Sequence, residues 1–143
     1  MEKLYLIATI AGQSVAIRAS LVDSVVDLGS IAPVPLAPGH IAGLAALRSK
    51  VLTVICCERS LGIAQCAPGL RRAVVVNIDG HFYGLLVSSI EDARLIEEPP
   101  QPIRTRLETG WARVAVGMLE YEGEALLLID PERIVAGQEA LAA

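Results

Sequence analysis

The stretch Ile41–Leu61, IAGLAALRSKVLTVICCERSL, is the most informative part of the sequence. Its first segment, IAGLAAL, predicts a short apolar turn, which ends at the charged corner Arg48-Ser49-Lys50. The following run, Val51–Cys57, is β-branched and too short for a helix, so it predicts a buried strand. Because apolar residues crowd Arg48 on both sides, we expect its guanidinium either to pair with a carboxylate of its own domain or to face a partner.

Composition and charge limit the class of protein. The chain has 143 residues, of which 53% are hydrophobic and 20% charged, so it can bury a core as one domain. A net charge of −4 and scattered aromatic residues argue against nucleic-acid binding. No apolar run reaches the roughly 20 residues that span a bilayer, and the first residues do not resemble a signal peptide. We therefore expect a cytoplasmic protein without direct membrane insertion.

The two halves of the sequence resemble each other, which predicts a duplicated unit. Each half begins with a strand–turn–strand pattern, at Leu4–Ile17 and at Ala73–Val87. One constant offset places the first turn on the second: Ile10 on Ile78, Gly12 on Gly80, and Ile17 on Leu85. A slightly larger offset aligns the later parts: Leu52 on Leu126, Val54 on Leu128, and Glu58-Arg59 on Glu132-Arg133.

Two copies of about five short strands predict an all-β fold of two small five-stranded barrels. Barrels remove exposed strand edges, and each barrel alone would be marginal at this size, so a shared core is expected. We place the subdomains at about residues 1–66 and 67–143 and leave open an exchange of strands between them. A short helical turn is expected at Ser20–Val26. A terminal helix is expected at Pro131–Ala143, with Asp130 as its N-cap.

Few residues suggest catalysis, and we expect no enzyme activity, cofactor or metal. His81 lies at a predicted hairpin tip and His40 in a loop, where both should be solvated. The glycines form no phosphate-binding loop, and the cysteines lack zinc-ligand spacing. Cys56 and Cys57 are expected to be buried, reduced thiols, as is typical of free cysteine. A thiol-dependent enzyme or redox sensor is an alternative that requires an exposed, reactive thiol.

The order of these features resembles the CheW-like domain, the family of small coupling proteins in bacterial chemotaxis arrays. The matching segments in the first half are Val34–Pro38, Ile41–Arg48 and Val51–Ile55, and their spacing is the most specific signal. Gly84–Val87 and Leu126–Asp130 match in the second half. The resemblance covers nearly the whole chain and implies two SH3-like barrels and no catalysis.

The resemblance also implies two protein partners. One is the regulatory domain of a CheA-type histidine kinase, which is homologous to CheW and is implied at the barrel ends. The other is the cytoplasmic tip of a methyl-accepting chemoreceptor, implied near the groove between the barrels. The implied partner-binding residues are Ile41, Leu44, Leu47, Arg48, Ser49, Val87 and Ser88.

Several positions depart from the family pattern. Ala46 and Ser49 stand where the family usually has asparagine and glycine, and Cys56-Cys57 replaces Asp-Leu. Ser88 stands where aspartate is frequent. If the turn required a positive φ at Ser49, the serine would cost about 1 kcal/mol. These departures leave open a divergent CheW-like module that serves another kinase pathway, such as one linked to pili or development, or a regulator that blocks an interface.

Overall fold

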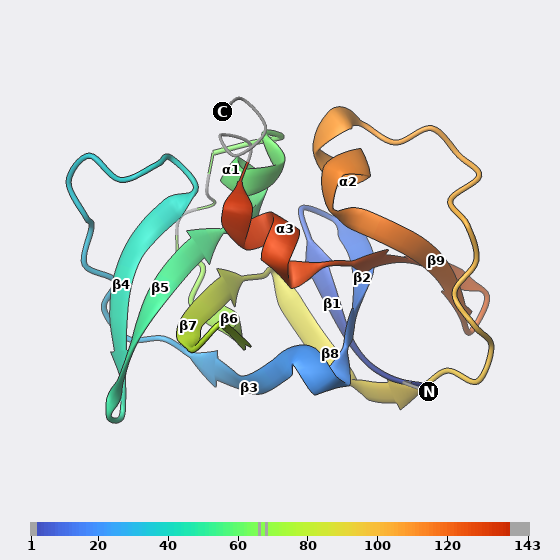
Figure 1. Ribbon diagram of the computed structural model, residues 1–143, viewed down its shortest axis with the longest axis horizontal. Helices are drawn as coiled ribbons and strands as arrows, with labels where there is room; N and C mark the ends of the chain where they lie inside the picture. The colour runs from blue at the N-terminus through green and yellow to red at the C-terminus, as the bar shows by residue number, and fades with distance from the viewer. Residues whose placement is uncertain (1–2, 66, 68, 138–143) are drawn as a thin grey trace.

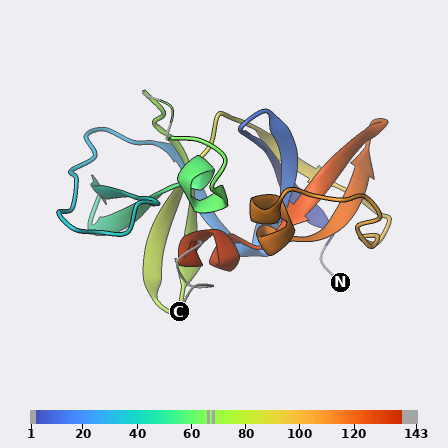
Figure 2. The same ribbon diagram turned by 90° about the horizontal axis from the view of Figure 1, so that it is seen from above.

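The computed structural model describes residues 3–65, 67 and 69–137, and it contains two five-stranded sheets that lie side by side (Figures 1 and 2). The first, barrel A, has the strand order β8-β1-β2-β10-β9. Its strands are β1 (Leu4–Ile10), β2 (Gln13–Arg18), β8 (Ser89–Leu95), β9 (Ala115–Tyr121) and β10 (Glu124–Ile129). The second, barrel B, has the order β3-β6-β7-β5-β4. Its strands are β3 (Val22–Asp27), β4 (Ile41–Leu47), β5 (Lys50–Cys56), β6 (Arg72–Ile78) and β7 (His81–Leu86). The predicted all-β fold with two five-stranded units is confirmed.

The described chain crosses between the barrels at two places. The first crossing is the 3-10 turn Ala19–Leu21 between β2 and β3, and the second is the Val87-Ser88 segment between β7 and β8. Barrel B is therefore one continuous run of strands inserted between β2 and β8 of barrel A. Each barrel contains strands from both sides of residue 66, which is the kind of exchange that the sequence left open.

The sheet registers follow the repeat found in the sequence. Val15 of β2 lies opposite Leu127 of β10 in a parallel pair, and Tyr83 of β7 lies opposite Thr53 of β5 in the same way. These two pairs are equivalent in the repeat, because the smaller offset places Val15 on Tyr83 and the larger offset places Thr53 on Leu127. Each barrel therefore combines the first hairpin of one repeat with the last three strands of the other.

The barrels share a hydrophobic core. Its fully buried members come from both barrels: Ile10, Val15, Ile17 and Ile129 from barrel A, and Ile55, Val74, Val76 and Leu85 from barrel B. Each barrel also has its own interior cluster, centred on Leu128 in barrel A and on Leu52 and Val54 in barrel B. Because the shared cluster needs strands from both barrels, neither barrel can keep its apolar surface buried without the other.

Three short helices gather beside the line where the barrels meet (Figures 1 and 2): α1 (Cys57–Leu61), α2 (Thr109–Val114) and α3 (Pro131–Ala136). As the sequence predicted, α3 begins with Asp130 as its N-cap, whose carboxylate accepts a hydrogen bond from the Glu132 amide at 3.0 Å. The helix ends at Ala136 with Gly137 as its C-cap, so it is shorter than the expected Pro131–Ala143, and residues 138–143 lie outside the described residues.

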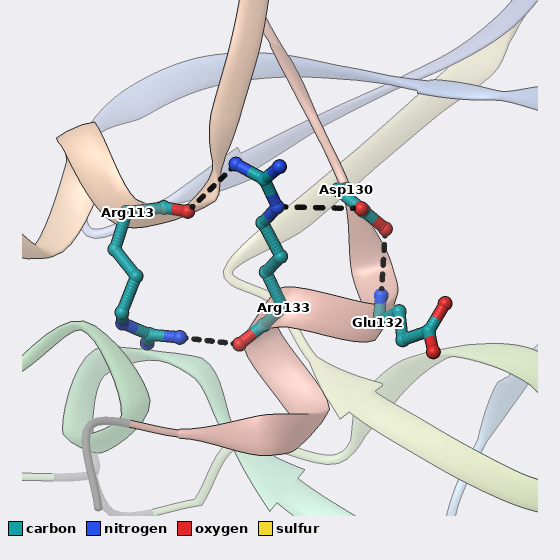
Figure 3. A network of polar contacts seen from close by, with 4 residues as sticks. All are labelled: Arg113, Asp130, Glu132 and Arg133. Atoms are coloured by element: carbon teal, nitrogen blue, oxygen red, sulfur yellow. Dashed lines mark hydrogen bonds and ion pairs between the residues drawn. The ribbon is translucent and has the colours of Figure 1, made fainter. Parts of the chain in front are cut away.

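A polar network connects these helices, and Figure 3 shows the part of it between α2 and α3. The Arg113 guanidinium donates to the main-chain oxygens of Ser60 and Arg133, which belong to α1 and α3. Arg133 donates in return to the Arg113 oxygen at 3.3 Å and forms an ion pair with Asp130 at 3.6 Å. Arg113 of α2 therefore donates to main-chain oxygens of both α1 and α3, and the Arg133 oxygen also accepts from the Gly137 amide at the end of α3.

Two predictions of local secondary structure are wrong. The segment Ile41–Leu47 is the strand β4 instead of an apolar turn, with Gly43 and Ala45 buried and with Leu44 and Ala46 exposed. The sequence does not reveal this alternation of buried and exposed residues, because the residues on both faces of the strand are small or apolar. The helical turn expected at Ser20–Val26 is limited to the 3-10 turn Ala19–Leu21, after which the chain enters β3.

His40 is buried, whereas the sequence suggested a solvated loop residue. Its Nε2 atom lies 2.8 Å from the main-chain oxygen of Val135 in α3, and 7% of the residue is exposed. The larger offset of the repeat places His40 on Val114, and the backbone confirms this equivalence. The His40 carbonyl accepts from the Cys56 amide just as the Val114 carbonyl accepts from the Asp130 amide. His40 thus occupies the place of a core residue of the second repeat, and its ring faces the helices.

Candidate functional site

An open row of side chains crosses three strands of barrel B. Tyr83 on β7 lies opposite Thr53 on β5, and Thr53 lies opposite Leu44 on β4. Leu44 is 39% exposed, and the other two residues are half-buried. Tyr83 packs against the shared core, so this row extends the shared core out to solvent.

The equivalent row of barrel A is closed. It consists of Val15, Leu127 and Met118, which pair across β2, β10 and β9 in the same register. Val15 is fully buried, Leu127 is 4% exposed, and Met118 packs against the shared core. The two repeats therefore differ in whether this row reaches solvent.

The connection between the third and fourth strands of each repeat explains this difference. In barrel B it comprises residues 28–40, whereas in barrel A it is longer and comprises residues 96–114. The longer connection includes α2 and packs Ile103 and Leu107 against the shared core. Both connections pair with their row through the main chain, Ala32 with Leu44 and Gln101 with Met118, but the Leu44 side chain remains 39% exposed. Barrel A thus has an internal apolar cover that barrel B lacks.

A second apolar pair continues the open row toward the end of the hairpin. Ala46 on β4 lies opposite Val51 on β5, and Val51 is 65% exposed. The expectation that the whole run Val51–Cys57 is buried is therefore wrong at Val51. Successive side chains of a strand point to opposite faces. Val51 and Thr53 alternate with the buried residues Leu52 and Val54, so this alternation could have predicted that Val51 is exposed.

The turn of this hairpin presents an unpaired arginine. Arg48 is exposed, and it forms no hydrogen bond or ion pair with any residue that the structure describes. The pairing with a carboxylate of its own domain is therefore not observed among these residues. The backbone of Arg48 has a φ of 55°, whereas Ser49 is not in the left-handed region, so the strain in the turn falls on the arginine.

Beside the turn, the end of barrel B contains a hollow of about 470 Å³. Its walls are residues 23–26 of β3 and residues 47–50 of the hairpin. Lys50 pairs with Asp23 across it at 3.5 Å, and the Lys50 ammonium lies 4.0 Å from the centre of the Phe82 ring. This end of barrel B therefore presents both an ion pair and aliphatic side chains to solvent.

The remaining expected site residues lie in different environments. Ile41 packs partly buried against the shared core, and Leu47 packs against the interior cluster of barrel B. Val87 is 1% exposed, so its side chain is a core residue that cannot contact a partner in this conformation. Ser88 is exposed at the crossing between the barrels, where its amide donates to the Thr9 oxygen at 2.9 Å. The structure thus brings Leu44, Arg48 and Ser49 together on one hairpin and places Ser88 elsewhere.

The described residues offer little for chemistry. They include no group of three His, Cys, Asp or Glu side chains arranged to hold a metal ion. Cys56 and Cys57 are reduced cysteines, each 1% exposed, and Cys66 lies outside the described residues. Within the same part of the chain, each helix is too short or too polar to cross a membrane.

Comparisons with known proteins agree with this architecture. A family model described as the CheW-like domain matches residues 4–139. The chemotaxis protein CheW of Rhizobium meliloti (strain 1021) is 28% identical over 116 residues, which cover 78% of this chain and 73% of that protein. The crystal structure of the scaffolding protein TtCheW from Thermoanaerobacter tengcongensis superimposes with a TM-score of 0.75 at 26% identity, covering 91% of this chain and 90% of that one. The chain described here belongs to the CheW-like domain family.

Proposed function

We propose that the protein is a chemotaxis scaffold that couples chemoreceptors to a CheA-type histidine kinase in the cytoplasm. The single observation that carries this proposal is the apolar row of barrel B, which is open to solvent while its counterpart in barrel A is covered. The names of the relatives, a chemotaxis protein and a scaffolding protein, support the same role. This role requires contact surfaces and no catalytic group.

The open row suits the tip of a receptor's helical hairpin. An amphipathic helix binds by placing apolar side chains into an apolar groove. Complete burial of Leu44 or Val51 would contribute at most about 1.5–3 kcal/mol each, because both are already partly covered. Arg48 adds a charge that has no partner among the described residues, so it is available to a carboxylate at the edge of the contact.

The hollow at the end of barrel B suits the CheW-homologous domain of the kinase. Its wall includes the exposed side chain of Val25, beside the hairpin turn. A homologous domain offers hairpins of the same shape, so two barrel ends can meet through similar surfaces. We therefore place the receptor on the face of the β4–β5 hairpin and the kinase domain at its end.

A calorimetric titration tests both contacts separately. The purified protein is titrated with the CheW-homologous kinase domain and, in a second experiment, with a receptor cytoplasmic fragment. Leu44→Asp is expected to weaken receptor binding at least about tenfold, because a charge would have to be buried in the apolar contact. Leu95→Asp is the matched control, since Leu95 is an exposed leucine on barrel A, and it should leave receptor binding unchanged.

The outcomes separate the proposed role from its alternatives. Equal loss of receptor binding in both leucine variants would place the receptor elsewhere. A folded protein that binds neither partner would favour a divergent CheW-like module for another kinase pathway, and binding of the kinase domain alone would favour a blocking regulator. A thiol sensor has little support, because Cys56 and Cys57 are buried.

A further inference from the structure

Arg59 of α1 and Arg133 of α3 occupy corresponding places in the two repeats. The larger offset of the repeat places Arg59 on Arg133, and it also places Gly39 on Arg113. Arg133 donates to the Arg113 oxygen at 3.3 Å. The Arg59 guanidinium lies against Gly39, so closely that a β-carbon on residue 39 would overlap its Nη2 atom and lie 3.0 Å from Cζ. Each arginine is therefore held beside the residue that its position in the repeat predicts.

Only the second of these arginines has a carboxylate partner. Arg133 forms an ion pair with Asp130 at 3.6 Å (Figure 3). The residue that corresponds to Asp130 in the first repeat is Cys56, which has no carboxylate and does not cap α1 with its side chain. Arg59 forms no ion pair with any residue that the structure describes. The first repeat therefore has the arginine without its anion.

The donors around Arg59 lack a common acceptor. Within the described chain, the Arg59 side chain makes one hydrogen bond, from Nη1 to the Gln65 Oε1 atom at 2.6 Å. A guanidinium has five N–H donors and no acceptor, so most of its donors are unused here. Because the Gln65 oxygen accepts from Arg59, the Gln65 amide nitrogen can donate to another group. The pair thus offers donors alone, which suits a ligand made of acceptor oxygens.

A hollow of about 420 Å³ adjoins this pair of side chains. It is lined by Arg59 and by residues 62–65, of which Gly62, Ala64 and Gln65 are exposed, so it is open to solvent. The carboxylate of α1, on Glu58, accepts from the Ala67 amide at 3.3 Å and does not pair with Arg59. We propose that this hollow binds an oxyanion, a carboxylate or a phosphate group, through Arg59 and Gln65.

This site lies apart from the surfaces proposed for coupling. In Figure 1, α1 lies at the top of the molecule near the line where the barrels meet, and the turn of the β4–β5 hairpin lies at the lower left. The inference goes beyond the proposed coupling role and does not depend on it. The oxyanion can belong to a free small molecule or to a side chain of a bound protein, because the chemistry of recognition is the same.

A nuclear magnetic resonance titration of the full chain tests the proposal. The probes are inorganic phosphate and acetate, with sodium chloride added to keep the ionic strength constant. Saturable shift changes are expected for the side-chain N–H signals of Arg59 and Gln65. An exposed contact of this kind is weak, so we expect a dissociation constant of millimolar order. Arg59→Gln should raise it about tenfold or more, whereas Arg104→Gln, which removes an exposed arginine with no described partner, should leave it unchanged.

Two further variants test the position of the guanidinium. Cys56→Asp supplies a carboxylate where the second repeat has Asp130, so it should compete with the anion and raise the dissociation constant about tenfold, whereas Cys56→Ser should bind as the wild type does. Gly39→Ala keeps the arginine but displaces it, because the added methyl group overlaps the guanidinium. It should weaken binding at least about threefold, whereas Gly29→Ala, where a β-carbon has no atom within 4 Å, should not.

The outcomes decide between a positioned site and general attraction to a cation. Melting temperatures establish which variants are folded, and Arg59→Gln and Gly39→Ala decide the matter if a change at the buried Cys56 prevents folding. No saturable shift with either ion up to about 50 mM, or equal shifts in the wild type and R59Q, would overturn the proposal.

The source of the oxyanion follows from repeating the titrations with the kinase domain and the receptor fragment. If phosphate competes with one of these proteins and R59Q weakens its binding, the oxyanion belongs to that protein. If phosphate binds and both proteins bind R59Q as they bind the wild type, the site takes a free anion.

Discussion

Gly110 of α2 lies so close to Leu61 of α1 that a β-carbon on residue 110 would overlap the main-chain carbonyl of Leu61. No flexible side chain separates the two helices at this point, so backbone meets backbone. This contact helps to fix α2, which is part of the connection that covers the apolar row of barrel A.

Gly110→Ala should therefore lower the free energy of unfolding by about 2 kcal/mol, because the added methyl group forces two helices apart. The higher helix propensity of alanine, about 1 kcal/mol, works in the opposite direction but does not remove the clash. Urea denaturation measures the change. Gly29→Ala is the matched control, since a β-carbon there has no atom within 4 Å, and it should change stability by less than about 0.5 kcal/mol. Equal stability of both variants would contradict the close contact.

Arg113 is expected to stabilise the same helical cluster. Burial lowers the pKa of its guanidinium from the ordinary arginine value, while the hydrogen bonds to Ser60 and Arg133 satisfy its terminal nitrogens. Arg113→Ala would remove the guanidinium donor from the Ser60 carbonyl and one of the two donors of the Arg133 carbonyl, which keeps the Gly137 amide, and should cost about 1.5–3 kcal/mol in urea denaturation. Arg104→Ala removes an exposed arginine with no described partner and should be nearly neutral. A neutral Arg113→Ala would mean that water replaces the guanidinium without loss.

The repeat explains how much of the fold could be predicted from the sequence. Turn glycines and alternating apolar residues identified the two strand–turn–strand units, and a proline after an aspartate identified the start of α3. These local signals could not predict which strands of one repeat pair with strands of the other. Register within a hairpin is local, whereas the parallel pair of β2 with β10 joins residues near opposite ends of the chain.

The candidate site was predicted less completely than the fold. Arg48 was singled out because apolar residues crowd it, and the resemblance adds Leu44 to the implied site, but the open row also includes Tyr83 and Val51. Whether an apolar residue of a strand is covered from solvent depends on segments that lie far from it in the sequence. In barrel A the cover comes from the connection with Ile103 and Leu107, and its absence in barrel B is visible only when the two barrels are compared in space.

The backbone strain at Arg48 leads to a test of the hairpin turn. Arg48→Gly should raise the free energy of unfolding by up to about 1 kcal/mol, because glycine adopts a positive φ without steric cost. Ser49→Gly is the control and should lower stability slightly, since Ser49 is not in the left-handed region and glycine adds entropy to the unfolded chain. Urea denaturation compares the two. A gain from Ser49→Gly and none from Arg48→Gly would show that the positive φ belongs to residue 49.

The strand order of barrel B predicts the behaviour of fragments. In the order β3-β6-β7-β5-β4, the hairpin β6–β7 separates β3 from β5. A fragment of residues 1–66 contains β3, β4 and β5 but lacks this hairpin, and its β1–β2 hairpin lacks β8 and β10. We expect the isolated fragment to show no cooperative thermal transition, because both incomplete sheets leave apolar faces and strand edges unpaired.

The complementary fragment, residues 67–143, should behave in the same way when isolated, since its strands also belong to both barrels. Mixing the two fragments should restore a cooperative transition and the near-ultraviolet circular dichroism signal of Trp111, which is 8% exposed and packs in the shared core. Each fragment supplies the strands that the other lacks in both barrels. Both sheets are therefore completed together when the fragments bind, which makes the transition of the complex cooperative. A cooperative melt of residues 1–66 alone would contradict the exchange of strands between the repeats, whereas fragments that fail to combine would show that the connection through residues 62–71 is needed for assembly.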